Sequence, residues 1–303
     1  MKYNFDFLND FSKESIEVSF DEPMNRHTSF KIGGNADVYC EVKTRKALAK
    51  LIGLCKDNGI PYYIIGKGSN LLVSDSGIRG AVIRLGGEFS EMSITEDGLI
   101  RCGAGASLAS ACGFALKNSL GGLEFAWGIP GTVGGAAFMN AGAYGGEMKD
   151  VVEAAIYIDE SGALRNCKRD EFDFSYRRSV FTDNDYIITD VFFKLDKKPQ
   201  RDIREKMDDL MNRRKSKQPL EYPSAGSTFK RPKGYFAAAL IEECGLKGAN
   251  IGGAEVSEKH SGFIINKNNA TCEDVKNLIA YVKEQVYKQK GVELHCEVKF
   301  IGA

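Results

Sequence analysis

The sequence lacks an excess of charge, a metal-binding cysteine spacing and a long apolar run. Its 303 residues include 41 Lys+Arg and 41 Asp+Glu, a formal net charge of zero, which argues against binding nucleic acid or a membrane through the whole surface. No two of the eight cysteines are spaced as CxxC, so we expect reduced thiols and no metal. With no signal peptide and no run of roughly 18 apolar residues, we expect a soluble, cytoplasmic protein.

Glycine, by contrast, is abundant and unevenly placed. There are 33 glycines, about 11% of the chain against an average near 7%. Residues 1–146 hold 23 of them, and 12 lie between Gly103 and Gly146. Because 43% of the residues are hydrophobic, this is no disordered tail. The pattern predicts a globular protein whose first half needs many tight turns and close backbone approaches.

Periodicity predicts short strands interleaved with helices, and therefore an α+β or α/β fold. Thr44 is a plausible N-cap for a helix whose apolar stripe includes Ala47, Leu48, Leu51, Ile52 and Cys55, and Ser107 for a second helix. Further strands are expected at 36–42, 62–65, 71–73, 81–85, 99–102, 151–159, 186–195, 262–266 and 292–301, and further helices at 201–217, 234–244 and 273–290. Residues 1–24 read as an N-terminal arm, and the composition shift at 197–203 suggests the main domain boundary.

A short glycine-rich loop, Gly66-Lys67-Gly68-Ser69-Asn70, directly follows an apolar strand. Successive N–H groups in such a loop can converge on an anion, although a plain turn is an equally good interpretation. A Walker A loop would need Ser or Thr after Lys67, and a Rossmann fingerprint would need glycine at Leu71. The loop therefore belongs to neither an ordinary dinucleotide fold nor a P-loop.

Residues 121–146 are too glycine-rich for one helix and too apolar for an exposed linker. They suggest backbone that passes close to a large flat ligand with its N–H groups toward the ligand, or else a tightly packed core crossing. Elsewhere, Arg177 and Arg178 lie beside two serines, where arginine could bind a carboxylate or phosphate in two-pronged fashion, although on its own the segment is more typical of a surface arginine pair. Ser227-Thr228-Phe229-Lys230 matches Ser-x-x-Lys only by chance, because its companion motifs are missing.

In order along the chain, these segments resemble one family, the UDP-N-acetylenolpyruvoylglucosamine reductases of peptidoglycan precursor synthesis. The resemblance runs from about Asn25 to the C-terminus. The markers are Asn25–Gly34, Gly66–Asn70, Gly128-Ile129-Pro130-Gly131 through Asn140–Gly145, Tyr176-Arg177-x-Ser179, Ala225-Gly226-Ser227-x-Phe229 and Glu297-Val298-x-Phe300-Ile301-Gly302. Each marker alone is weak, but six in order are specific.

The resemblance implies an α+β protein with an FAD-binding domain of the vanillyl-alcohol-oxidase (PCMH) type at 25–198, built of two α+β subdomains. A C-terminal α+β substrate domain would occupy 199–303. It implies bound FAD, with NADPH as the hydride donor and a sugar nucleotide as substrate. The implied FAD contacts are Gly66, Lys67, Gly68, Ser69 and Asn70 for the pyrophosphate, and Gly128, Ile129, Pro130, Gly131, Thr132, Gly134, Gly135, Asn140, Gly142 and Ala143 along the flavin.

Three residues match the family's catalytic positions. Reduced flavin gives hydride to the enolpyruvyl β-carbon of UDP-N-acetylglucosamine enolpyruvate, and the product is UDP-N-acetylmuramate. Arg177 matches the arginine that pairs with the substrate carboxylate, Glu297 the acid that polarises it, and Ser227 the proton donor to the α-carbon. Tyr176 and Lys217 match substrate contacts.

The chain resembles the shorter branch of the family, because an inserted loop carrying a tyrosine over the substrate has no room between Phe181 and Lys194. Arg231 stands where the longer branch has an asparagine, which makes it a candidate contact for the substrate diphosphate. Two alternatives stay open at this point: an FAD oxidoreductase of the same fold with a different substrate, and a flavin-binding module without catalysis.

Overall fold

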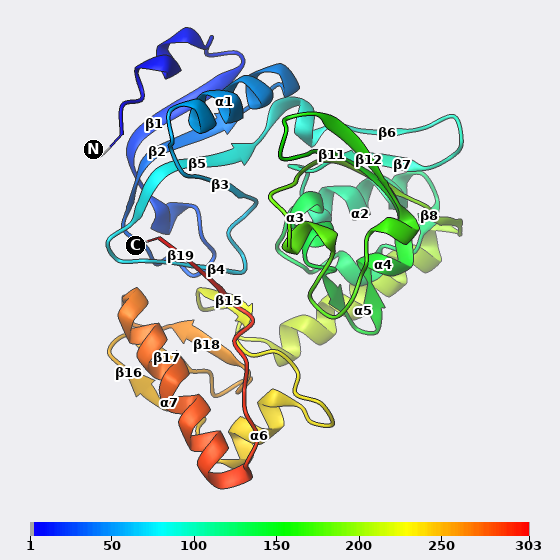
Figure 1. Cartoon of the computed structure of the whole chain (residues 1–303). Coiled ribbons are helices and arrows are strands. Elements are labelled where there is room, and N and C mark those ends of the chain that lie inside the picture. Colours follow the sequence, from blue (N-terminus) through cyan, green and yellow to red (C-terminus); the bar gives the residue numbers. More distant parts are fainter. Residues whose placement is uncertain (1–2, 303) are drawn as a thin grey trace. The chain divides into compact units, whose positions relative to one another are not determined.

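The chain forms two compact units, each assembled from separate stretches of sequence (Figure 1). The computed structural model describes residues 3–302. The first unit comprises Met1–Ser19, Tyr39–Gly66 and Ala81–Arg214, and the second comprises Phe20–Val38, Lys67–Gly80 and Lys215–Ala303. Helices and strands alternate in both units, as the periodicity predicts.

The compact units divide the chain differently from the predicted boundary at 198–199. Helix α5 (Gln200–Lys217) begins just after that position, and the first unit extends to Arg214, near the end of this helix. Strands β1 (Ile16–Pro23), β2 (Asn35–Val42) and β5 (Ile78–Leu85) each begin in one unit and end in the other. A composition shift marks a change in solvent exposure, and such a change need not coincide with the end of a packed unit.

A four-stranded sheet has the order β1-β2-β5-β3, in which β3 (Tyr62–Ile65) runs parallel to β5. Strand β1 corrects the expectation that residues 1–24 form only an arm, since 16–23 add an edge strand. Helix α1 (Arg45–Asp57) follows β2, and Thr44 caps it by accepting a hydrogen bond from the Ala47 N–H. The buried residues of α1 are those of the predicted stripe, Ala47, Leu48, Leu51, Ile52 and Cys55.

The core of the first unit lies on a five-stranded antiparallel sheet with the order β12-β11-β13-β7-β6. Helix α3 (Val133–Phe138) packs against β13 and β7, and helix α2 (Leu108–Lys117) begins at the predicted cap, Ser107. The remaining elements of this unit are β6 (Met92–Ile94), β7 (Ile100–Gly103), β8 (Leu120–Gly121), β9 (Gly142–Ala143), β10 (Gly146–Glu147), α4 (Met148–Val151), β11 (Val152–Ile158), β12 (Leu164–Lys168), β13 (Ile187–Phe193) and β14 (Asp196–Lys197).

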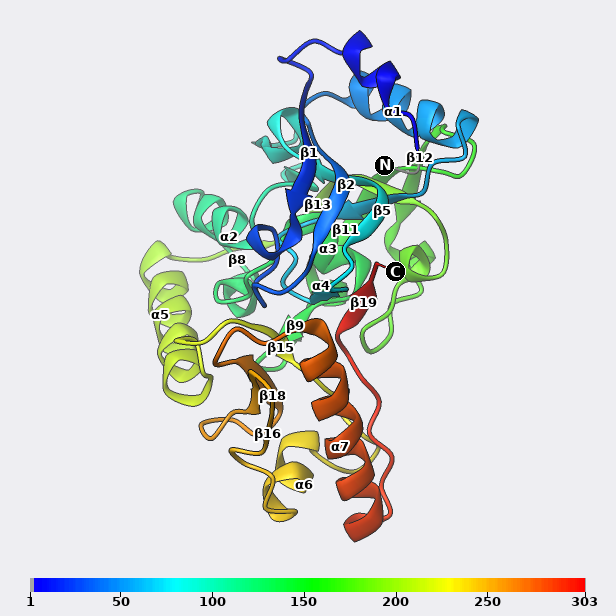
Figure 2. The same cartoon turned by 90° about the vertical axis from the view of Figure 1, so that its left-hand side faces the viewer.

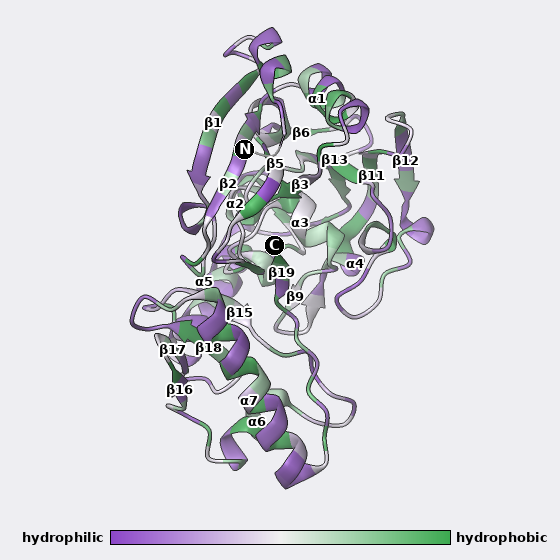
Figure 3. Cartoon of the chain, turned by 60° about the vertical axis from the view of Figure 1, so that its left-hand side comes forward, coloured by the Kyte–Doolittle hydropathy of each residue, from purple (hydrophilic) through white to green (hydrophobic). Residues whose placement is uncertain are grey.

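The second unit has an antiparallel sheet with the order β15-β18-β17-β16, against which α7 (Cys272–Lys290) packs (Figure 2). Six buried residues of α7 recur at helical spacing, and Figure 3 shows this apolar stripe beside the helix's hydrophilic face. The sheet and its companions are β15 (Ser224–Ser227), β16 (Asn250–Ile251), β17 (Ala254–Val256), β18 (Phe263–Asn266), α6 (Ala237–Glu243), and the parallel pair β4 (Leu71–Val73) and β19 (Lys299–Ile301).

The final segment is only partly the alternating strand predicted for 292–301. A regular strand covers Lys299–Ile301 alone, while Cys296 forms an isolated bridge with Phe229. Alternation of apolar and charged residues in 292–301 would bury Phe300 and expose Glu297, but Glu297 is buried and Phe300 is 43% exposed. The reason is that the segment changes partners, from residues 228–230 to β4. A single alternation of inward and outward side chains therefore does not hold along its whole length.

All eight cysteines are free thiols, and six of them are buried. Burial raises the pKa of Cys40 and of Cys102 to about 12, so these thiols behave as small apolar side chains. Within residues 3–302, no group of three or more His, Cys, Asp or Glu side chains is placed to hold a metal ion. None of the described helices combines the length and apolar character needed to cross a membrane.

Candidate functional site

The loop predicted to hold a pyrophosphate begins at Gly66, and the rest of it, Lys67–Asn70, lies in the second unit. Gly68 has a left-handed backbone (φ +60°), and a Cβ there would stand 2.2 Å from the His27 carbonyl oxygen. The Ser29 N–H donates to the Gly68 carbonyl, and this hydrogen bond helps to fix the loop. None of the four N–H groups from Lys67 to Asn70 donates to another described residue. A fixed turn with open donors fits a phosphate.

The stretch predicted to line the flavin packs tightly against its own unit. Thr132 caps α3 by accepting from the Gly135 N–H, and its Oγ1 lies 2.5 Å from where a Cβ on Gly66 would stand. The N–H groups of Val133 and Gly134 donate to the carbonyls of Ala106 and Ala104. The expectation that N–H groups here point at a ligand is therefore wrong for Val133–Gly135, because neighbouring protein atoms already accept those bonds. Any ligand contact there must use other atoms.

Arg177 occupies a tight turn in the first unit, between Ser175 and Arg178. The Arg178 N–H donates to the Ser175 carbonyl at 3.2 Å, and Arg177 is the third residue of the turn, with φ +57°. A left-handed backbone costs a residue other than glycine roughly 1–2 kcal/mol. It persists only where surrounding contacts hold it, and such strain concentrates at functional sites.

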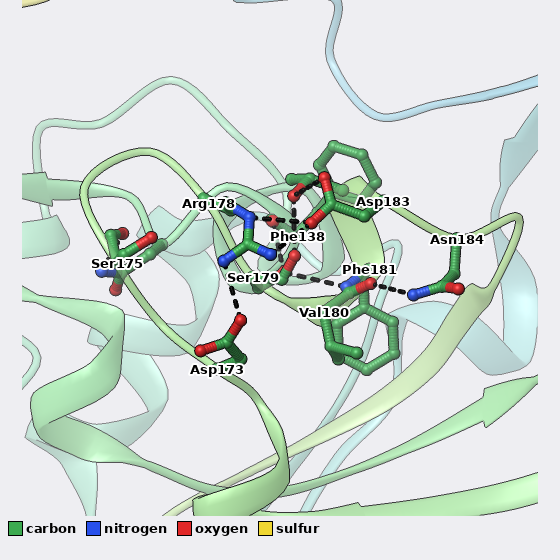
Figure 4. Close-up of polar contacts among 11 residues, drawn as sticks. Phe138, Asp173, Ser175, Arg178, Ser179, Val180, Phe181, Asp183 and Asn184 are labelled. Carbon is green, nitrogen blue, oxygen red and sulfur yellow. Dashed lines mark hydrogen bonds and ion pairs between the residues drawn. The ribbon is translucent and has the colours of Figure 1, made fainter.

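Arg178 provides two of the contacts that hold this turn. Its guanidinium donates to Asp173 at 2.7 Å and to Asp183 at 2.6 Å, so it ties the two sides of the turn together (Figure 4). These carboxylates raise the pKa of Arg178 further above its ordinary value. On the far side of Arg178, the Ser179 hydroxyl donates to the Phe138 carbonyl at 2.6 Å. The sequence motif Tyr176-Arg177-x-Ser179 leaves Arg178 unassigned, and the structure assigns it this structural role.

Asn140, predicted as an FAD contact, is 1% exposed. Its side-chain amide forms three hydrogen bonds, all of them with protein atoms. Its amide N–H groups donate to Glu147 at 2.9 Å and to the Ser175 carbonyl at 3.0 Å, and its oxygen accepts from the Lys149 N–H. It therefore links the β9–β10 hairpin to the turn that carries Arg177. No sequence spacing could have shown this link, since its partners lie 7 to 35 residues away.

Ser227 and Glu297 come together in the second unit, 70 residues apart in sequence. The Glu297 N–H donates to the carbonyl of Thr228, the residue after Ser227, at 2.8 Å. The Asn70 amide donates to the Glu297 carbonyl at 3.3 Å, and the Asn70 carbonyl accepts from the Lys299 N–H at 2.9 Å. Glu297 is 8% exposed and Ser227 is exposed. Glu297 thus adjoins the end of the predicted pyrophosphate loop, and its N–H is bonded to the residue that follows Ser227.

His260 is a neighbour of this cluster that the sequence did not single out. Ser227 pairs with Phe263 across the sheet, and the His260 ring stacks edge-on to the Phe263 ring at 4.9 Å. Burial lowers the pKa of His260, and its Nδ1 accepts from the Gly262 N–H, which leaves the proton of a neutral ring on Nε2. His260 belongs to no recognisable sequence motif, so its position beside Ser227 could be found only from the fold.

The predicted substrate contacts are all accessible to a ligand. Tyr176 is 46% exposed beside Arg177, with the guanidinium carbon 5.0 Å from the ring centre. Lys217, the last residue of α5, is exposed. The Arg231 guanidinium lies over the Phe236 ring at 3.9 Å, and Phe236 is 61% exposed. Gly142 and Ala143 form β9. Their contact with the flavin stays a prediction.

Comparison with known proteins finds two families along the chain. Residues 218–301 match the family described as UDP-N-acetylenolpyruvoylglucosamine reductase, C-terminal domain. Residues 36–168 match the family described as FAD binding domain.

Complete relatives cover nearly the whole chain. A UDP-N-acetylenolpyruvoylglucosamine reductase of Clostridium botulinum is 53% identical over 285 residues, 94% of this chain and 92% of the relative. One from Caldanaerobacter subterraneus is 50% identical over 297 residues, 98% of this chain and 97% of the relative. The crystal structure of UDP-N-acetylenolpyruvylglucosamine reductase from Thermus caldophilus matches with a TM-score of 0.80 and 35% identity, over 94% of this chain and 98% of that one.

Proposed function

The chain belongs to the UDP-N-acetylenolpyruvoylglucosamine reductase family, and we propose that Arg177, Ser227 and Glu297 carry out its reaction. It is an FAD-dependent reductase that oxidises NADPH and acts in peptidoglycan precursor synthesis. Its substrate is UDP-N-acetylglucosamine enolpyruvate and its product UDP-N-acetylmuramate. FAD, when bound, would supply the hydride-transfer chemistry between NADPH and the substrate. The protein must hold both ligands, stabilise charge and deliver a proton.

The residues suited to hold FAD are those predicted from the resemblance. Lys67–Asn70 would hold the pyrophosphate, because their N–H groups are open and their turn is fixed. Gly128–Gly135 and the β9 hairpin would line the ring. Since the N–H groups of Val133–Gly135 are already bonded, this wall would contribute shape and apolar surface rather than donors.

Arg177 would bind the substrate carboxylate. Hydride addition to the β-carbon leaves enolate-like charge at the α-carbon and on this carboxylate, and a planar guanidinium can pair with both carboxylate oxygens. The pinned, left-handed turn supports this role, since it orients the arginine before the substrate arrives. This is the observation that carries the proposal in the first unit.

Ser227 would then protonate the α-carbon, and Glu297 in its protonated form would polarise the carboxylate by a hydrogen bond. A serine hydroxyl is a weak acid, so its efficiency must come from its fixed position. The backbone bond between Glu297 and Thr228 supports a shared site, because it keeps the two side chains on adjacent segments.

Lys217 and Arg231 would bind the substrate diphosphate, with Tyr176 beside the carboxylate. Arg231 lies flat on Phe236 and presents its charge at an exposed loop. If Arg231 contacts the diphosphate, Arg231→Ala should raise the Michaelis constant for the sugar nucleotide roughly tenfold, the loss of one charged hydrogen bond, with NADPH oxidation by bound FAD unchanged. An unaltered Michaelis constant would remove Arg231 from the site.

A direct assay tests the function as a whole. Purified protein should bind FAD and turn yellow, and the enolpyruvyl sugar nucleotide should accelerate its NADPH oxidation. Colourless protein that cannot be reconstituted with FAD would contradict the proposal. We place the enzyme in the cytoplasm, where reduced thiols such as its eight free cysteines are the norm.

A further inference from the structure

Arg214 is a partly buried arginine without a protein partner. It lies near the end of α5, where its side chain is half-buried, and among the residues that the structure describes none forms a hydrogen bond or ion pair with its guanidinium. Two other arginines of this helix are paired, Arg201 with Glu205 and Arg213 with Asp209, and Arg204 is exposed to solvent. Removing a charge from water without a partner is costly, so an anion is expected there.

The side chain of Arg214 lies on the wall predicted to face the flavin. Its Cδ is 2.8 Å from where a Cβ on Gly128 would stand, so a larger residue at position 128 would have to displace the arginine side chain. Tyr144, at the tip of the β9–β10 hairpin, lies near enough to act on it electrostatically, while burial lowers the pKa of the guanidinium. All three residues belong to the first unit. Arg214 lies outside both matched ranges, 36–168 and 218–301.

Given the proposed function, on which this inference rests, the flavin itself can supply the anion. The oxidised ring is neutral, and hydride uptake adds two electrons and a proton, so the reduced ring carries one negative charge in its pyrimidine half. A fixed cation near that half would favour the reduced form. We propose that Arg214 is a cofactor-binding residue that stabilises the reduced, anionic form of FAD against the Gly128 wall.

The test compares the FAD midpoint potential of the holoenzyme with those of Arg214→Gln and Arg214→Lys. Loss of the charge should reduce the preference for reduced over oxidised FAD at least tenfold, which lowers the two-electron potential by about 30 mV. Lysine keeps the charge and should retain most of the potential. Arg213→Gln is the matched control, since it removes the neighbouring exposed charge and should leave the potential unchanged.

Sulfite provides a readout that needs no turnover, because its addition to oxidised FAD also makes the ring anionic. Its affinity should fall at least tenfold in Arg214→Gln and should not change in Arg213→Gln. If Arg214→Gln fails to fold, Arg214→Met preserves the packing of the side-chain stem on Gly128 and should show the same two losses.

Three outcomes would overturn the inference. Unchanged potential and sulfite affinity in a folded, charge-free variant would show that Arg214 only packs. A raised Michaelis constant for the sugar nucleotide with an unchanged potential would assign Arg214 to a substrate anion. Weaker binding of oxidised FAD with an unchanged potential would assign it to the pyrophosphate. Failure of the wild-type chain to bind FAD would instead contradict the proposed function itself.

Discussion

The two units hold their catalytic residues by different means. In the first, Arg177 is held by side chains: Arg178 bridges Asp173 and Asp183, and Asn140 bonds the turn from beneath. In the second, Glu297 is held at its backbone: its N–H donates to the Thr228 carbonyl, and its carbonyl accepts from the Asn70 side-chain amide. Side-chain supports can be removed by substitution, whereas backbone bonds cannot.

This difference suits the two tasks. Arg177 must present a planar fork in one orientation, and a strained backbone conformation gives that orientation only if neighbours enforce it. Ser227 and Glu297 need to stay adjacent, which a backbone bond between their segments already ensures. We therefore expect the first unit to be sensitive to substitutions around its catalytic residue and the second to be sensitive mainly at the catalytic residues themselves.

The substitution Arg177→Gly should change stability and turnover in opposite directions, because it relieves the backbone strain and removes the guanidinium. Glycine adopts φ near +57° without cost, so the variant should unfold at higher denaturant, with a free energy of unfolding about 1 kcal/mol larger. It should also lose roughly 10²–10³-fold in turnover, the usual loss when one charge-stabilising group is removed. Chemical denaturation and steady-state assays measure both effects. A variant that is less stable than wild type would show that the turn stores no strain.

Smaller effects are expected from two substitutions beside the catalytic residues, Asn140→Ala in the first unit and Thr228→Val in the second. Each leaves buried polar groups unsatisfied, since the Thr228 hydroxyl accepts from the Ile264 N–H, so each should lose roughly 1–3 kcal/mol of stability. Only Asn140→Ala should also lower kcat/KM roughly tenfold or more, because the Arg177 turn loses its support. Equal losses of kcat/KM in the two variants would remove the distinction between the units.

Local features of the fold could be predicted from the sequence because they depend on neighbouring residues. The caps at Thr44 and Ser107 and the stripe of α1 follow from residues three and four apart, and the structure confirms them. The position of Gly66–Asn70 directly after a strand is likewise confirmed. The family also follows from local motifs, once six of them stand in order.

Features set by distant partners could not be predicted. Strand β1 forms because β2 offers an edge, which residues 1–24 alone do not indicate. Glu297 is buried because its segment changes neighbours, against the alternation of its own sequence. The roles of Arg178 and Asn140 depend on carboxylates and carbonyls elsewhere in the first unit. A run of charges or a single polar residue in the sequence does not indicate which distant residues it will bond.

Stopped-flow analysis of Ser227→Ala separates proton delivery by Ser227 from the reduction of FAD by NADPH. The variant should reduce its FAD with NADPH at nearly the wild-type rate. Reoxidation by the enolpyruvyl sugar nucleotide should be roughly 10²–10⁴-fold slower, the range expected for loss of a general acid. Equal slowing of the two half-reactions, or reoxidation at the wild-type rate, would contradict the account.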